Sequence, residues 1–273
     1  MWIARARPLL GTVVAIHAHA DPGDASHVVH AISEAFAVMA HIGNVMSAHH
    51  RASDLARLSR ATPGETLCLD AQTVCVLKAA QYWWRLSRGA FNPCHAAQSL
   101  SHKGVRPGLA TLAMGSLSDL DIRSSTHVRC AAPVQLDFGG IAKGFAVDRA
   151  IEVLSAHGVQ DTLVNAGGDL RAMGKRQWPI DVRHAKREVA DGRLGQKIRI
   201  QQQALATSVS GALNPEFVLT QLHKKPKWRS VSVQAATCMA ADALTKWAMQ
   251  SSLLCPDLRA ALRQNQGRLW RTQ

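Results

Sequence analysis

Apolar positions in the middle of the chain change from a continuous run to a helical spacing. The run Val134–Phe138 predicts a strand, and two glycines and a lysine follow it closely. Gly158 marks the end of the helical spacing as a C′ residue, and the apolar run Thr162–Val164 predicts a second strand. The residues that share the helix face are Ile141, Phe145, Ala150, Ile151 and Leu154. The pattern therefore predicts a strand, a helix and a strand, with a glycine pair after each strand.

Three further elements follow from the same kind of pattern. Val13–Ile16 predicts a strand, and a helix is expected from about His27 to Ile42, with Val28, Ile32, Phe36 and Met39 on one face. Asp70 is the expected N-cap of a helix that runs to about Arg88 and is ended by Gly89. Long helices and strand pairs without regular βα alternation favour the α+β class.

Length and composition limit the architecture. The chain has 273 residues, 47% of them hydrophobic, which is enough for a substantial core. It shows no internal repeat or long linker, so we expect a single domain over 1–273, which could divide into two subdomains. No run of 18 apolar residues occurs, so no membrane span is expected.

The net charge of +13 permits an anionic partner such as nucleic acid, a membrane surface or a phosphate-bearing ligand. The basic residues are scattered, and no predicted helix carries a basic stripe interleaved with aromatic residues. A solvated basic surface explains the densest clusters, and a positive cleft would also suit a pyrophosphate. Nucleic-acid binding is therefore not expected.

The cysteines and the N-terminal residues give only weak indications of function and location. The six cysteines contain no CxxC spacing, which argues against a zinc site, and we expect scattered thiols. Arg5 and Arg7 followed by Leu9–Ile16 resemble a short secretory leader, but Pro8 and Gly11 interrupt the apolar run. An unprocessed cytoplasmic chain is favoured over a periplasmic one.

The two glycine pairs are the first candidates for ligand binding. Gly139-Gly140 and Gly167-Gly168 each follow a predicted strand, and the first pair precedes a helix N-terminus. Such turns let a backbone approach an anion, so a phosphate-bearing ligand is one interpretation. The alternative is a pair of ordinary tight turns, because neither motif is a GxGxxG or P-loop sequence.

The segment Asp137–Asp148, with Asn165–Asp169 after it, resembles the signature of the ApbE-like FAD:protein FMN transferases. Other segments resemble further motifs of that family, in the family's order along the chain: Arg7–Thr12, Met46–His49, Ser53–Leu55, Gly89–Pro93 and Ala241–Leu244. The resemblance covers nearly the whole chain, and the central motif is its most specific part.

The resemblance implies an ApbE-like α+β fold, with mixed sheets flanked by helices and a flavin site in a cleft between them. It implies transfer of FMN from FAD to a Thr or Ser hydroxyl of an acceptor protein, with release of AMP. The acceptors of such enzymes include subunits of redox and electron-transport systems. The residues it assigns to FAD binding are Leu10, His49, Ala90, Phe91, Asn92, Gly139, Gly140, Lys143, Phe145, Gly167, Gly168 and Leu219.

The resemblance also implies a Mg²⁺ site. Its ligands would be the Ala142 carbonyl, the Asp242 carboxylate and Thr245, which are hard oxygen donors. The family usually places threonine four residues after the aspartate, where this chain has Lys246. Thr245 lies on the same helix face and could substitute. Alternatively, the Lys246 ammonium could itself neutralise phosphate charge, or Asp242 and Lys246 could be a solvated surface pair.

Several family positions differ in this chain. The flavin-stacking position is His49, the aspartate of the Gly-x-Phe-Asp motif is Asn92, and the opening methionine is Leu10. The family's histidine that activates the acceptor hydroxyl would align with Phe217, which cannot take a proton. His223 is the nearest substitute, and we expect it to be the catalytic base. The alternative function is therefore a degenerate FAD-binding protein, a flavin carrier or redox partner with little transfer activity.

Overall fold

The computed structural model describes residues 1–94, 115–182, 196–209, 228–252 and 255–272. Their contacts form two compact units. Unit 1 comprises Met1–His41, Lys143–Val209 and Lys227–Gln273, and the described residues of unit 2 lie within Ile42–Ala142. This division does not test the prediction of a single domain with two possible subdomains, which stays a prediction.

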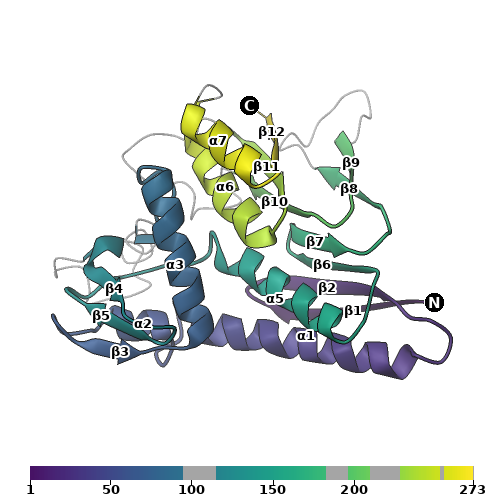
Figure 1. Ribbon diagram of the computed structural model, residues 1–273, viewed down its shortest axis with the longest axis horizontal. Coiled ribbons are helices and arrows are strands. Elements are labelled where there is room, and N and C mark those ends of the chain that lie inside the picture. Colours follow the sequence, from purple (N-terminus) through teal and green to yellow (C-terminus); the bar gives the residue numbers. More distant parts are fainter. Residues whose placement is uncertain (95–114, 183–195, 210–227, 253–254, 273) are drawn as a thin grey trace. The chain divides into compact units, whose positions relative to one another are not determined.

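Unit 1 is built on a seven-stranded sheet with the order β1-β2-β6-β7-β10-β11-β12 (Figure 1). Every pairing in this sheet is antiparallel. Because neighbouring strands run in opposite directions, short turns connect β1 to β2 and β6 to β7. The strands are β1 Trp2–Leu9, β2 Thr12–His19, β6 Thr162–Ala166, β7 Asp169–Met173, β10 Ala204–Val209, β11 Ser230–Ala235 and β12 Arg268–Thr272.

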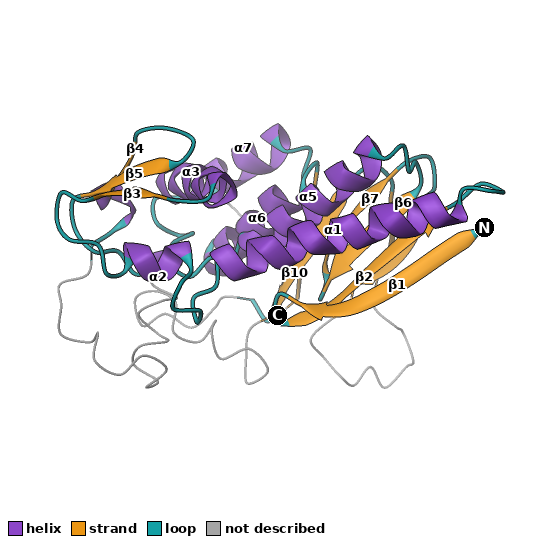
Figure 2. Cartoon of the chain, turned by 90° about the horizontal axis from the view of Figure 1, so that it is seen from below, coloured by secondary structure: helices purple, strands orange, loops and turns teal. Residues whose placement is uncertain are grey.

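In the described part of the chain, four helices belong wholly or mainly to this unit: α1 Ala25–Val45, α5 Ala142–Ala156, α6 Cys238–Gln250 and α7 Pro256–Gln264. Helix α6 packs against β7, β10 and β11. Strands and helices occupy distinct layers in Figure 2. The side chains of β7 alternate between the two faces of the sheet, as a strand requires. Asp169 and Arg171 contact α5, whereas Leu170 and Ala172 lie in a separate apolar cluster.

That apolar cluster is covered by a hairpin of β8 Trp178–Val182 and β9 Gln196–Ile200. Trp178 is its largest side chain, and Val182, Ile198 and Ile200 of the hairpin are also buried there. The sheet is therefore covered on both faces, and the face toward α5 and α6 carries the polar residues of the candidate site.

Helix α1 buries one face and exposes the other, as the spacing predicted. Val28, Ile32, Phe36 and Met39 are buried, and the Arg7 guanidinium of β1 lies 4.8 Å from the Phe36 ring centre. Among the described residues, α1 is the one helix long and apolar enough to cross a membrane, and 39% of its most apolar stretch is buried. A core helix also meets that test, so the expected absence of a membrane span stays a prediction.

Unit 2 has a three-stranded antiparallel sheet of β3 Thr66–Cys68, β5 His127–Cys130 and β4 Leu120–Ile122. The helices in its described residues are α2 Asp54–Leu58 and α3 Ala71–Leu86, together with a 3₁₀ turn at Leu117–Asp119. Asp70 caps α3 as predicted, because its side chain accepts the Gln72 N–H.

The α+β class is confirmed, and α5 and β6 correspond to the predicted helix and second strand. The predicted strand Val134–Phe138 is wrong. Val134, Leu136 and Phe138 are buried as an apolar run requires. However, the Val134 and Asp137 N–H groups donate to the Leu58 and Pro93 carbonyls, so the segment joins no strand ladder.

Candidate functional site

The start of α5 lies against the start of α6, and a glycine permits the contact. A Cβ atom on Gly144 would lie 2.6 Å from the Cys238 carbonyl carbon and 2.8 Å from the Met239 nitrogen. Real side chains do not approach backbone so closely, so only glycine fits there. The Gly144 N–H points toward Asp242 Oδ2 at 3.4 Å, which directs the first turn of α5 at a carboxylate of α6.

Asp148, one turn further along α5, caps the N-terminus of α6. Its Oδ1 accepts the Cys238 N–H at 2.8 Å and its Oδ2 accepts the Met239 N–H at 2.8 Å. Arg171 Nη1 of β7 donates to the same Oδ1 at 2.7 Å. Burial raises the pKa of Asp148, and Arg171 with the two N–H groups acts in the opposite direction. A helix N-terminus favours a carboxylate at this place, so Asp148 joins α5, α6 and β7.

Asp169 is presented by the tight turn between β6 and β7. Gly167 and Gly168 both have positive φ, at 65° and 105°, and Asn165 Oδ1 accepts the Gly168 N–H at 2.9 Å. Directly after this turn, the Asp169 carboxylate is 1% exposed and lies 2.8 Å from Lys143 Nζ. The turn therefore positions a buried carboxylate beside the lysine of the central motif.

Asp169 and Lys143 influence each other through their charges. Burial raises the pKa of Asp169, and the neighbouring Asp242 carboxylate raises it further. Burial works against the Lys143 charge, but Asp169 and Asp242 outweigh it and raise the pKa of Lys143. Lys143 is therefore a cation held by two carboxylates.

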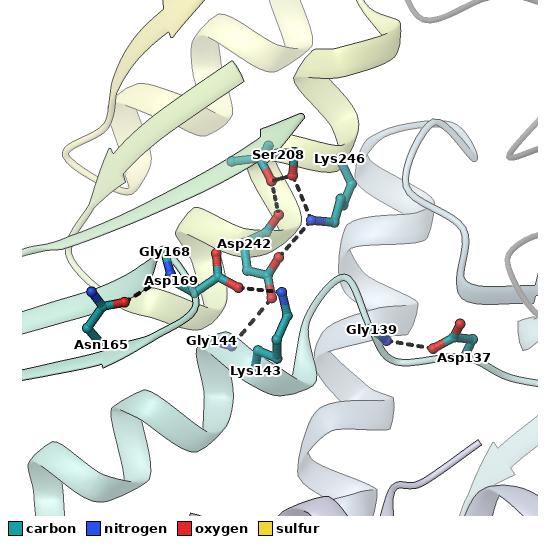
Figure 3. A network of polar contacts seen from close by, with 11 residues as sticks. Asp137, Gly139, Lys143, Gly144, Asn165, Gly168, Asp169, Ser208, Asp242 and Lys246 are labelled. Carbon is teal, nitrogen blue, oxygen red and sulfur yellow. Dashed lines mark hydrogen bonds and ion pairs between the residues drawn. The ribbon is translucent and has the colours of Figure 1, made fainter. Parts of the chain in front are cut away.

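Lys246 is the second ammonium group of the cluster (Figure 3). Its Nζ lies 3.1 Å from Asp242 Oδ1 and donates to Ser208 Oγ at 2.6 Å. The Thr245 hydroxyl donates to the Asp242 backbone carbonyl at 2.7 Å, and the Ser208 and Thr245 oxygens are 2.7 Å apart. A lysine donates only and Thr245 already donates elsewhere, so Ser208 donates to Thr245. The polar groups of β10 and α6 thus form one directed chain from Lys246.

We call the six residues Lys143, Asp148, Asp169, Arg171, Asp242 and Lys246 the charged cluster. It contains three carboxylates and three basic groups. Asp242 and Asp169 are 0% and 1% exposed, whereas the side chains of Lys143 and Lys246 are 31% and 18% exposed. Negative charge is therefore buried and the accessible part of the cluster is positive, which suits a phosphate-bearing ligand.

The structure also locates the other predicted residues of unit 1. Leu10, in the turn between β1 and β2, has a positive φ of 54°. A Cβ on Gly167 would lie 3.0 Å from Thr12 Cβ, so the β1–β2 and β6–β7 turns are neighbours. Phe145 is 4% exposed and packs in the core. Their predicted contacts with FAD stay predictions.

Within unit 2, the predicted residues make local contacts. The His49 N–H donates to Ser47 Oγ, Phe91 is buried, and Asn92 Oδ1 accepts the Cys94 N–H at 3.0 Å. The Gly139 N–H donates to Asp137 Oδ1 at 2.8 Å. Gly139 and Gly140 do not share the positive φ of Gly167 and Gly168. Ala90 precedes Phe91 in its turn, and Ala142 is the first residue of α5.

Sequence reasoning assigned no role to four residues of this region: Asp148, Asp169, Arg171 and Ser208. Asp148 could have been noticed, because it is the last residue of the signature segment Asp137–Asp148. The structure shows that it is buried within α5, and buried charges need partners. The partners could not have been identified, since Cys238 and Met239 are 90 and 91 residues away in the sequence. His223, Leu219 and Phe217 lie outside the described residues.

Comparison with known proteins identifies the family of this chain. Residues 10–253 match the model of the ApbE family. A FAD:protein FMN transferase of Treponema pallidum is 27% identical over 209 residues, or 70% of this chain and 57% of the relative's length. This chain therefore corresponds to only 57% of that protein.

A FAD:protein FMN transferase of Vibrio cholerae is 25% identical over 262 residues, covering 87% of this chain and 78% of that protein. The solved structure of the flavin transferase ApbE from Vibrio cholerae superimposes with a TM-score of 0.81 and 22% identity. It covers 99% of this chain and 93% of that one. The structural likeness shows the fold.

Proposed function

The chain belongs to the ApbE family, and we propose that it transfers FMN from FAD to a Thr or Ser hydroxyl of an acceptor protein. Two relatives carry the name FAD:protein FMN transferase. The observation in this molecule that carries the proposal is the charged cluster. The ammonium groups of Lys143 and Lys246 are partly accessible above the buried carboxylates of Asp169 and Asp242. FAD contains a pyrophosphate, which such a cationic surface would bind.

The reaction forms one bond and breaks one. The acceptor hydroxyl oxygen bonds to the phosphorus on the FMN side of FAD, the pyrophosphate P–O bond breaks, and AMP leaves. The hydroxyl proton passes to a base, for which His223 is our candidate. Negative charge grows on the phosphate oxygens, and fixed cations that face them lower the barrier. Lys143 is held as a cation for this task by its carboxylate partners.

Mg²⁺ is part of the proposal. Asp242 Oδ1 and Asp169 Oδ2 are buried carboxylate oxygens that lie beside the Lys246 and Lys143 ammonium groups, and such hard oxygens suit this ion. Asp242, Thr245 and the Ala142 carbonyl would hold it, and it would neutralise charge on the phosphate oxygens. In the described structure, Thr245 uses its hydroxyl to bond the Asp242 carbonyl and Ser208. Lys246 already lies beside Asp242 Oδ1.

We further propose that the ligand-binding turns act together on FAD. In unit 1 these are the turns with Leu10, Gly167 and Gly168, along with Lys143 and Phe145 of α5. In the rest of the chain, the residues that we assign to FAD binding are His49, Ala90, Phe91, Asn92, Gly139, Gly140 and Leu219. The acceptor is a protein of a redox or electron-transport system.

Mass spectrometry tests the proposed function. The protein is incubated with FAD, Mg²⁺ and candidate acceptor proteins, and the acceptor mass and released AMP are measured together. We expect an acceptor heavier by one FMN less water, and an equal amount of AMP. Asp242→Asn should abolish both signals, whereas Asp121→Asn, at an exposed carboxylate of unit 2, should not. Retained FAD with neither signal would instead indicate a flavin carrier.

A further inference from the structure

The residue at position 246 gives the charged cluster a resident cation. Lys246 follows Asp242 by one helical turn on α6, and its Nζ lies 3.1 Å from Asp242 Oδ1. Asp242 is 0% exposed, so this contact is not a solvated surface pair. The ammonium is present whether or not a metal ion is bound. The Lys246 ammonium lies beside Asp242 Oδ1, an oxygen of a residue that we propose as a metal ligand.

The surrounding contacts fix the position of this ammonium. Lys246 donates to Ser208 Oγ at 2.6 Å, and Ser208 is tied to Thr245 at 2.7 Å. Thr245 is in turn anchored on the Asp242 backbone carbonyl. Figure 3 shows Ser208 and Asp242 on either side of the Lys246 amine. A lysine held from two elements keeps its charge in one place, as a positioning cation must.

Charge balance in the cluster also indicates that Lys246 takes the place of another cation beside Asp242. The three carboxylates of the charged cluster already face three basic groups. Without Lys246, Asp242 would need another cation to balance it. With Lys246 in place, a divalent ion entering at Asp242 meets a positive charge beside the oxygen it would bind.

We propose that Lys246 is a phosphate-binding cation that supplies, for FAD binding, charge otherwise supplied by a divalent metal ion, so that this chain binds FAD without a metal and Mg²⁺ would be needed only for transfer. The inference rests on the proposed function, since FAD is the ligand. Lys246 keeps 18% of its side chain exposed next to Lys143, at 31%. The two ammonium groups thus offer paired positive charge to the two phosphates of the ligand.

FAD binding in EDTA and in Mg²⁺ tests the inference by calorimetric titration. Wild type should bind FAD with the same affinity in both. Lys246→Met should bind about 10- to 100-fold more weakly in EDTA, the loss expected for one charged hydrogen bond. Mg²⁺ should restore much of that affinity. Lys246→Arg should keep metal-free binding, and Lys197→Met, at an exposed position of β9, controls for the loss of one positive charge.

A second readout uses the metal alone. Mn²⁺ titration followed by electron paramagnetic resonance, without FAD, should show tighter binding to Lys246→Met than to wild type. Circular dichroism checks that each variant is folded, and the wild-type comparison in EDTA needs no variant. FAD binding by wild type only with Mg²⁺, or equal Mn²⁺ affinity in both proteins, would overturn this inference and leave the transferase proposal standing. No FAD binding in either condition would overturn both.

Discussion

Helix α5 makes polar contacts at both ends, and the two ends differ in burial. Near its start, Lys143 contacts Asp169 of β7 and Asp148 accepts the Cys238 N–H of α6, and both of these partners are almost fully buried. Just after its end, His157 Nε2 lies 3.1 Å from Glu34 of α1, which is 52% exposed, and His30 lies 3.4 Å from the same carboxylate. The distances are similar, so the comparison isolates the effect of the surroundings.

Burial determines what each contact does. Water solvates Glu34 whether or not a histidine is near, so the exposed contacts contribute little to stability. The carboxylates of Asp148 and Asp169 have lost their water, and only protein groups compensate them. The buried end therefore fixes geometry and concentrates positive charge where a ligand can reach it, and the exposed end does neither.

The largest loss of stability at the buried end of α5 is expected from Asp148→Ala. The substitution removes three hydrogen bonds and leaves Arg171 and the α6 N-terminus without their partner. Loss of one partner of a buried pair costs about 3–5 kcal/mol. Urea unfolding followed by circular dichroism measures it. A loss of unfolding free energy smaller than that of the exposed substitution Glu34→Gln would show that Asp148 is not a structural cap.

Gly144→Ala should have the next largest effect. The new methyl group would collide with the backbone at Cys238, so α5 and α6 must move apart. Overpacking of this kind costs about 1–3 kcal/mol. Gly158→Ala is the control on the same segment, because a Cβ there meets no atom within 4 Å and only the positive φ of 75° is strained. Equal destabilisation of the two variants would argue against close helix contact.

A buried thiol of unit 2 extends the comparison to pH. Burial raises the pKa of Cys94 to about 12, whereas an unfolded chain releases a thiol proton near about 8.5. The folded form keeps the proton longer, so this contribution to stability is complete below the unfolded pKa and is lost as pH rises toward 12. Between about pH 8.5 and 10, wild type should lose roughly 1–2 kcal/mol more than Cys94→Ala.

Urea midpoints at the two pH values give that difference. Alkylation with iodoacetamide gives an independent check, since Cys68 and Cys75 are exposed and Cys94 is buried. The exposed thiols should react in the folded protein and Cys94 only after unfolding. Equal pH dependence in both proteins, together with labelling of native Cys94, would contradict the assignment.

The smallest change in stability is expected for the exposed contacts just after the end of α5. Glu34→Gln removes the charge that faces His30 and His157, and stability should change by less than about 1 kcal/mol. Raising the salt concentration should reduce that difference further. A loss approaching that of Asp148→Ala would mean that the exposed contacts are as important as the buried ones.

Sequence patterns predicted the elements whose signals are local. The apolar spacing located α1 and α5, Asp70 marked the start of α3, and Gly158 marked the end of α5. The segment 134–138 was misassigned because burial alone does not make a strand. Its backbone bonds go to loop carbonyls that no local pattern reveals.

The residues of the candidate site also fall into those that the sequence revealed and those that it did not. Lys143 and Asp242 were found because they lie in family motifs, and the structure brings both into the charged cluster. The roles of Asp148, Arg171 and Ser208 depend on partners 90, 23 and 37 residues away. Only tertiary packing creates those contacts, so spacing could not reveal them.

A crystal structure of the protein with FAD would test the central claim most directly. The account predicts that pyrophosphate oxygens lie at charge-assisted hydrogen-bond distance, about 2.7–2.9 Å, from both Lys143 Nζ and Lys246 Nζ. It also predicts that Asp148 still caps α6 in the complex. A pyrophosphate bound away from both ammonium groups would contradict the proposal that the charged cluster binds the part of FAD at which transfer occurs.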